Sequence, residues 1–155
     1  MILMAQERGS GSPRGTGRAL AGACSVIFAI AFNFTNIGPV AKPEAHAYGV
    51  SLEVVGLLPT LVVLGHAIFN IPAGRVIDRA GAKPLIAGGV VLLGVLNVAL
   101  LASPAIWLGL TAHALFGIGT AAAFVGASDY VRSISASALN QGMIGGAALG
   151  GSGVA

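Results

Sequence analysis

Charged residues are scarce in this chain of 155 residues, because Asp, Glu, Lys and Arg together make up only 8% of it while 55% is apolar. Soluble domains carry about 25% charged residues. Water would leave too much apolar surface exposed, so the composition excludes an ordinary soluble domain and favours lipid as the solvent. The net charge of +3 does not indicate a nucleic-acid partner, because the basic residues flank apolar runs instead of forming a basic face.

Cysteine is almost absent as well. Cys24 is alone, so an intrachain disulfide is excluded and thiol-based metal or redox chemistry has no support. The sequence also lacks a nucleophile elbow, a phosphate-binding loop and any cluster with metal-ligand spacing. We therefore predict no enzymatic activity, no cofactor and no metal site.

Long apolar runs are the feature that the chain does have. A helix needs about 20 apolar residues to cross a bilayer. Four runs are that long, and they cover residues 19–40, 51–73, 84–102 and 105–127. A fifth run, 140–155, is too short to span. The sequence thus predicts an all-α membrane protein, a multi-pass transmembrane helix bundle with about four complete helices and a partial fifth.

The distribution of Lys and Arg predicts the topology. Cytoplasmic loops carry an excess of these residues. With the N-terminus inside, seven of the eight fall on the cytoplasmic side and only Lys42 falls outside. We therefore expect an integral protein of the cell membrane with a disordered cytoplasmic tail over 1–18. An outer loop is expected over 41–50, with Ser51 as the N-cap of the next helix, and a tight outer turn at 103–104.

A charged segment joins the second and third runs. Between Gly74 and Pro84 the sequence reads G-x-x-x-D-R-x-G-x-K-P. This pattern, in this place, resembles the loop between helices 2 and 3 of the major facilitator superfamily of secondary transporters. The order of the runs over 19–155 and the stretch Tyr48–Pro59 are similar to that family too. The resemblance implies a partial N-terminal domain of a transporter that moves a small solute by alternating access.

The resemblance also implies that the charged loop forms an ion-pair network holding the cytoplasmic face in one state. The positions concerned are Gly74, Asp78, Arg79, Gly81 and Lys83, with Arg132 on the fourth helix as an available partner. From the residues alone, Gly74 is expected to end a helix and Gly81 to permit a turn with positive φ. The alternative is that the bases only anchor the loop at the membrane surface.

Polar residues inside the runs are candidates for cavity lining or ion coupling, since such groups are costly in a membrane. Asn33 and Asn36 share a face of the first helix, and His66 and Asn70 share a face of the second. His113 stands where the family's R-x-x-x-G-x-G pattern has an Arg associated with proton coupling. The alternatives are hydrogen bonding between helices for the two asparagines of the first helix, packing against the fourth helix for His66 and Asn70, and a hydrogen-bonded neutral imidazole for His113.

The number of spans suggests an N-terminal fragment. The family's transporters have two six-helix halves, whereas this chain has four spans and part of a fifth. We expect it to be inactive alone, with the bilayer, a small-molecule solute with or without a coupling ion, and the missing C-terminal half as partners. The alternative is a small oligomeric four-helix membrane protein, either a scaffold or a small exporter. Such exporters use an acid within the first helix, and 19–40 has none.

Overall fold

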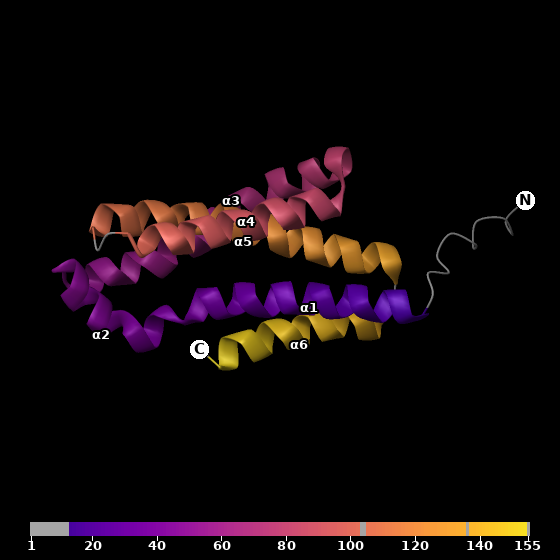
Figure 1. The fold of residues 1–155 in the computed structure, drawn as a ribbon, viewed down its shortest axis with the longest axis horizontal. Coiled ribbons are helices and arrows are strands. Elements are labelled where there is room, and N and C mark those ends of the chain that lie inside the picture. The colour runs from indigo at the N-terminus through magenta and orange to yellow at the C-terminus, as the bar shows by residue number, and fades with distance from the viewer. Residues whose placement is uncertain (1–12, 103–104, 136, 155) are drawn as a thin grey trace, which may run out of the picture.

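The computed structural model describes residues 13–102, 105–135 and 137–154, and every regular element in those ranges is a helix (Figure 1). The helices are α1 (Pro13–Thr35), α2 (Ile37–Tyr48), α3 (Leu52–Ala80), α4 (Ala82–Leu100), α5 (Ile106–Ile134) and α6 (Ala138–Gly153). This confirms the all-α prediction. The tight turn predicted at 103–104 and most of the predicted tail lie outside the described residues.

Four of these helices are long and apolar enough to cross a membrane: Gly15–Thr35, Leu52–Ala80, Ala82–Leu100 and Ile106–Ile134. Their outer faces carry large apolar side chains, such as Ile71, Val98 and Trp107, which are 67–77% exposed in the isolated chain. A helix satisfies its own backbone hydrogen bonds, so such a surface suits lipid. The chain is an integral multi-pass membrane protein.

Helix α3 does not stop where the apolar run stops. It continues through Gly74 to Ala80, so the expectation that Gly74 ends a helix is wrong. The charged residues beyond position 73 are compatible with a helix, and the backbone ladder continues past the apolar stretch. The break comes at Gly81, whose φ of 83° is the positive value expected for the turn. Helix α5 likewise runs seven residues past its predicted span.

The first apolar run is divided, and the loop predicted over 41–50 is mostly helical. Helix α1 ends at Thr35, and α2 runs from Ile37 to Tyr48, with Gly49 as its C-cap at a φ of 65°. Ser51 is the N-cap residue of α3, but its hydroxyl donates to the Glu53 carboxylate at 2.8 Å instead of capping the backbone. Helix α1 begins at residue 13, so the disorder predicted for 1–18 is wrong for residues 13–18.

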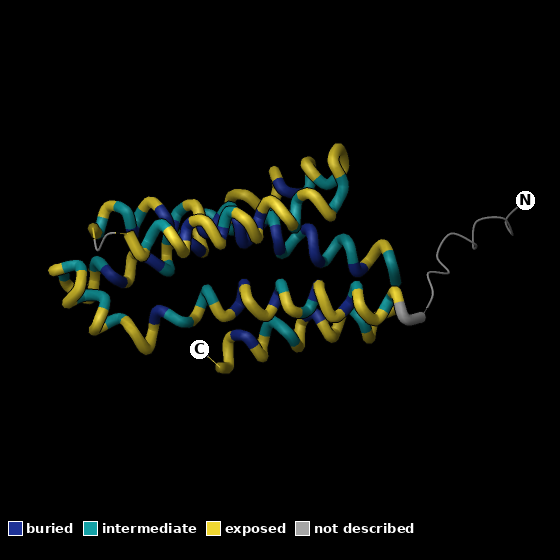
Figure 2. The backbone as a smooth tube through the Cα atoms, viewed as in Figure 1, coloured by how far each residue is buried: buried dark blue, intermediate teal, exposed yellow. Residues whose placement is uncertain are grey.

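The helices form two layers. Helices α3, α4 and α5 lie side by side in one, and α1 packs on α6 in the other, while α2 joins the layers at one end (Figure 1). Helix α5 is central: half of the residues in its most apolar 18-residue stretch are buried, compared with 17–28% in the corresponding stretches of the other three spans (Figure 2). Glycines allow the closest approach: a Cβ at Gly117 of α5 would lie 2.6 Å from the Cα of Gly65 in α3.

Candidate functional site

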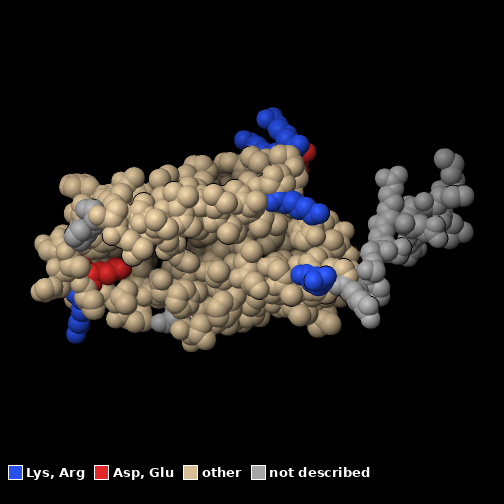
Figure 3. Space-filling model, viewed as in Figure 1, with Lys and Arg blue, Asp and Glu red and all other residues tan. Residues whose placement is uncertain are grey.

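The two ends of the bundle differ in charge. Figure 3 shows Lys and Arg gathered at the end where α1 begins and α3 meets α4, called here the basic end. Arg75, Arg79 and Lys83 surround the α3–α4 connection there. At the opposite end, called the α2 end, Lys42 and Glu44 lie on α2. Among the described residues, the charged groups thus lie toward the two ends of the bundle.

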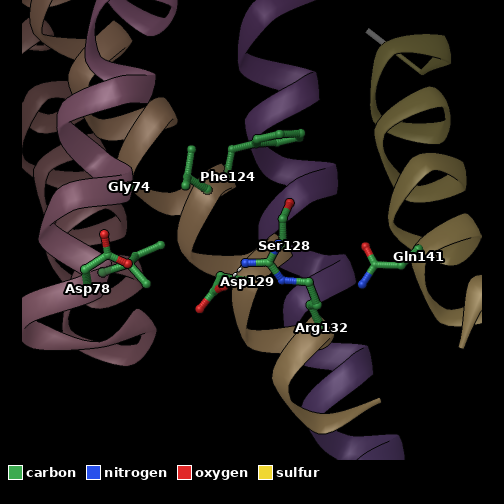
Figure 4. A pocket seen from close by; sticks show the side chains of 9 residues that line it. Gly74, Asp78, Phe124, Ser128, Asp129, Arg132 and Gln141 are labelled. Carbon is green, nitrogen blue, oxygen red and sulfur yellow. Dashed lines mark hydrogen bonds and ion pairs between the residues drawn. The ribbon is translucent and has the colours of Figure 1, made fainter. Parts of the chain in front are cut away.

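A cavity of about 410 Å³ opens at the basic end between α3, α5 and α6 (Figure 4). Its lining includes Asp78 from α3, Arg132 from α5 and Gln141 from α6. The structure therefore brings Asp78 and Arg132 to one cavity. The guanidinium of Arg132, however, pairs with Asp129 at 2.5 Å, one turn earlier on α5. Asp129 is a residue that the sequence analysis did not select.

The other residues of the charged segment occupy different places. Gly74 lines the same cavity from α3, and Arg79 is exposed near the end of that helix. Lys83, in the first turn of α4, holds its Nζ 5.6 Å from the ring centroid of Tyr130. A cation over an aromatic face at this distance is attracted to it. Lys83 thus links the start of α4 to the end of α5.

A second cavity, of about 260 Å³, lies toward the α2 end between α1–α2 and the layer of α3, α4 and α5. We call it the α2-end cavity. Its polar lining residues are Asn33, Asn36, Glu44, Tyr48, Asn97, His113 and Thr120. Three of these, Asn33, Asn36 and His113, are predicted candidates that the structure brings together from α1, the α1–α2 link and α5. The other four come from α2, α4 and α5 and were not selected.

Hydrogen bonds fix the orientation of three of these polar groups. Asn33 Nδ2, Asn97 Nδ2 and His113 Nδ1 each lie 2.8–3.0 Å from the backbone carbonyl four residues earlier. A carbonyl oxygen only accepts, so each nitrogen is the donor. This leaves Oδ1 and the second Nδ2–H of both amides, together with Nε2 of the neutral histidine, available to a ligand.

Glu44 is the charged member of the α2-end cavity. It is half-buried, and its Oε2 is shielded from solvent without a hydrogen-bond partner among the described residues. Burial raises the pKa of the Glu44 carboxyl, and burial together with the charge of Glu44 raises the pKa of Tyr48. The sequence does contain a signal for both. If 41–50 is read as helix, Val40, Glu44 and Tyr48 follow Asn36 at four-residue steps along one face.

His66 lines a different cavity, of about 180 Å³, between α1, α3, α5 and α6. Its Nδ1 lies 3.1 Å from Thr120 Oγ1. The Thr120 hydroxyl donates to the carbonyl of Gly117 at 3.0 Å, so it accepts from His66 Nδ1–H. The rings of Phe34 and Phe124 stand edge-on to the imidazole, with centroids 5.3 and 5.7 Å away. His66 therefore takes part in the packing of α3 against α5.

Asn70, the remaining candidate, lines neither the α2-end cavity nor the His66 cavity. Its Oδ1 is buried without a hydrogen-bond partner among the residues that the structure describes. Asn70 lies one turn beyond His66 toward the basic end of α3. Although His66 and Asn70 were predicted to share a helix face, only His66 lines the cavity described above.

A family model and a curated protein both match the chain. The model of the Major Facilitator Superfamily matches residues 23–155. The inner membrane transport protein YajR of Escherichia coli (strain K12) is 36% identical to the chain over 97 residues. The matched stretch is 58% of this chain but 21% of that protein, so the chain spans about a fifth of the length of this curated relative. No solved structure matches the chain.

Proposed function

The chain belongs to the major facilitator superfamily, and we propose that it forms one wall of the solute path of a secondary transporter that works by alternating access. The observation that carries this proposal is the α2-end cavity. It places seven polar residues from four helices and the α1–α2 link inside a bundle with an apolar exterior. Polar groups at this depth are costly unless they serve a path or a partner. In this role the chain has no enzymatic activity.

The two-layer arrangement supports the same role. The α2-end cavity, the basic-end cavity and the His66 cavity each draw lining residues from both layers, α1, α2 or α6 on one side and α3, α4 or α5 on the other. Transporters of this kind work by rocking helix bundles around a midplane site.

We propose further that the chain does not complete transport alone. A solute must be enclosed from both sides, and the family's transporters use a second half for the opposite wall. The relative YajR extends well beyond its matched stretch, which supports this view. The missing C-terminal half is then the partner that completes the path, the N-terminus is cytoplasmic, and the host is the inner or plasma membrane.

Two reconstituted proteins test the proposal. One is the chain alone, and the other is a chimera in which the chain replaces the matching part of YajR. Both are placed in liposomes with a proton or sodium gradient and offered small anions, sugars and amines, with intact YajR as the positive control. We expect saturable uptake by the chimera, and we expect uptake by the chain alone to be no faster than that of empty vesicles.

Inactivity of the chimera on a solute that YajR moves would contradict the proposal. Uptake by the chain alone would favour a small oligomeric transporter.

We propose that three charged residues at the basic end, Asp78, Asp129 and Arg132, act as the gate at the cytoplasmic face. Asp78 and Arg132 line one cavity, and Arg132 pairs with Asp129 in this structure, so an exchange of its carboxylate partner could accompany opening and closing. In the chimera, Asp78→Asn should lower uptake several-fold while the amount of protein in the membrane stays the same, because the exposed Asp78 contributes little to packing. Uptake equal to that of the unmodified chimera would leave only a surface-anchoring role for the charges.

A further inference from the structure

We propose that the α2-end cavity binds a small organic cation that carries N–H donors, that is, a protonated amine. This inference rests on the proposed function, because it takes the cavity as part of the solute path and adds the chemical class of the solute. It is drawn from the charge, the hydrogen-bonding groups and the size of the cavity.

The charge of the cavity is negative. Among the described residues that line it, Glu44 carries the only formal charge when His113 is neutral. Lys42, two residues earlier on α2, is exposed and does not line the cavity. Oε2 of Glu44 is shielded from solvent and has no hydrogen-bond partner within the described part of the chain. Burying a polar group without a hydrogen bond is costly, so a ligand that supplies the missing interaction is favoured. For a carboxylate, that ligand is a cation or a hydrogen-bond donor.

The neutral polar groups favour a donor-bearing ligand. The amide nitrogens of Asn33 and Asn97 and Nδ1 of His113 are each bonded to a backbone carbonyl. Two amide oxygens and one imidazole nitrogen are therefore left as acceptors, and each amide keeps one N–H donor. An ammonium group has up to three N–H donors and no acceptor, so it satisfies such groups without competing for them. A cation without N–H groups would satisfy the charge of Glu44 but not these acceptors.

The size and the apolar part of the lining limit the ligand further. The cavity measures about 260 Å³ and is bordered by Ile37, Val40, Val62 and Phe116 besides its polar groups. It therefore suits one ammonium head with a small apolar body. An anion would face Glu44 with no cation to compensate, and burying like charges together is unfavourable.

Binding measurements on the chain itself test the inference without requiring transport. The purified chain is placed in nanodiscs of zwitterionic phosphatidylcholine, so that lipid charge does not attract the cation. Calorimetric titration then compares benzylammonium with benzyl alcohol, benzoate and benzyltrimethylammonium, with empty nanodiscs as the blank. The variant Glu44→Gln keeps the shape of the side chain and removes its charge. Glu53→Gln is the matched control, since Glu53 is exposed and lies outside the cavity.

We expect benzylammonium to bind at least about tenfold more tightly than the other three probes, a difference of about 1.4 kcal/mol. Glu44→Gln should weaken its binding about tenfold or more, while Glu53→Gln should change it less than twofold. Equal binding of benzylammonium and benzyl alcohol, or tightest binding of benzoate, would overturn the inference from the unaltered chain alone. Unchanged binding by a well-folded Glu44→Gln variant would also overturn it. Amine binding with an inactive chimera would instead contradict the proposed function.

Discussion

Glu44 differs from the other acids of the described chain in its surroundings. Glu53 and Asp78 are exposed to solvent, Glu53 also accepts from the Ser51 hydroxyl, and Asp129 pairs with Arg132. Glu44 sits beside Tyr48 on a short helix outside the four spans, where burial disfavours its ionised form. Its charge state is therefore set by how water and ligand reach the cavity.

The raised pKa of Glu44 predicts how amine binding depends on pH. The carboxyl binds its proton at a higher pH than an ordinary Glu does, and only the ionised form attracts a cation. Benzylammonium affinity should therefore fall as the pH is lowered through the range just above the ordinary pKa of a Glu side chain. The raised pKa of Glu44 also affects stability. It favours the folded state at low pH, and this contribution is lost as the pH rises through the pKa that Glu44 has in the folded protein. Calorimetry over a pH series measures the first effect, and an identical slope in Glu44→Gln would contradict it.

The His66–Thr120 hydrogen bond predicts a second effect at the scale of single residues. Thr120→Val keeps the shape and removes the hydroxyl that accepts from His66, so it should lower the free energy of unfolding by about 1–2 kcal/mol. Thr111→Val is the control, because Thr111 is exposed on the same helix and its hydroxyl donates to the Trp107 carbonyl of that helix. Denaturant unfolding in detergent measures both. Equal losses for the two variants would show that the hydrogen bond to His66 adds nothing.

Sequence periodicity identified some of the residues that line the α2-end cavity but missed the lining residues contributed by α2 and α4. The three-residue spacing of Asn33 and Asn36 was enough to place both on one face, and both line the cavity. Spacing within one helix says nothing about which faces of separate helices meet, so Asn97 of α4 could not be joined to them. Glu44 was placed in a loop, which hid its register with the asparagines. The functional roles of these residues stay predictions.

At the scale of whole helices, glycine decides how closely α3 and α5 approach. A Cβ at Gly117 would lie 2.6–2.7 Å from backbone atoms of Val62, Gly65 and His66, and backbone atoms have no rotamer by which to move away. Small residues at such crossings let helices in membranes gain van der Waals contact that larger residues prevent. The α3–α5 pair therefore depends on these positions remaining glycine.

Gly117→Ala should accordingly separate the two helices and destabilise the bundle by about 1–3 kcal/mol, the usual range for overpacking. Gly94→Ala is the matched control on α4, because nothing lies within 4 Å of a Cβ built there. That variant should be neutral or slightly stabilising, since Ala has the higher helix propensity. Thermal unfolding in detergent compares them, and an unfolding temperature for Gly117→Ala equal to that of Gly94→Ala would contradict the close crossing.

The helices themselves were largely predictable from apolar runs, but their ends were not. The apolar run ending at position 73 marks where the chain becomes polar, whereas α3 ends seven residues later at Ala80 because the residues between are compatible with a helix. Gly81 was predicted correctly since positive φ is a local requirement that glycine meets. The division between α1 and α2 at Asn36 does have a breaker: Pro39 cannot donate to the Thr35 carbonyl four residues earlier, and its ring clashes with that carbonyl. The apolar run continues across this position, so run length alone predicted a single span.

At the scale of the molecule, the charge difference between the two ends predicts the orientation in the membrane. In a Cys24→Ala background, Ala47→Cys at the α2 end should react with a membrane-impermeant thiol reagent added to intact cells. Ala80→Cys at the basic end should react only after the membrane is opened, because basic segments stay in the cytoplasm. Both alanines are exposed, so access to the protein surface does not limit either reaction. Labelling of position 80 from outside would reverse the proposed topology.

The pairing of α1 with α6 has a consequence for biosynthesis. Helix α1 makes its most extensive contact with α6, yet α1 ends at Thr35 and α6 begins only at Ala138. At roughly 5–20 residues per second, the ribosome needs about 5–20 s to synthesise the intervening chain. During that interval the face of α1 that later receives Gly151 must be covered by lipid or by the insertion machinery. Helix α1 is therefore synthesised before the other five helices but must wait for the last of them, α6, to complete its packing.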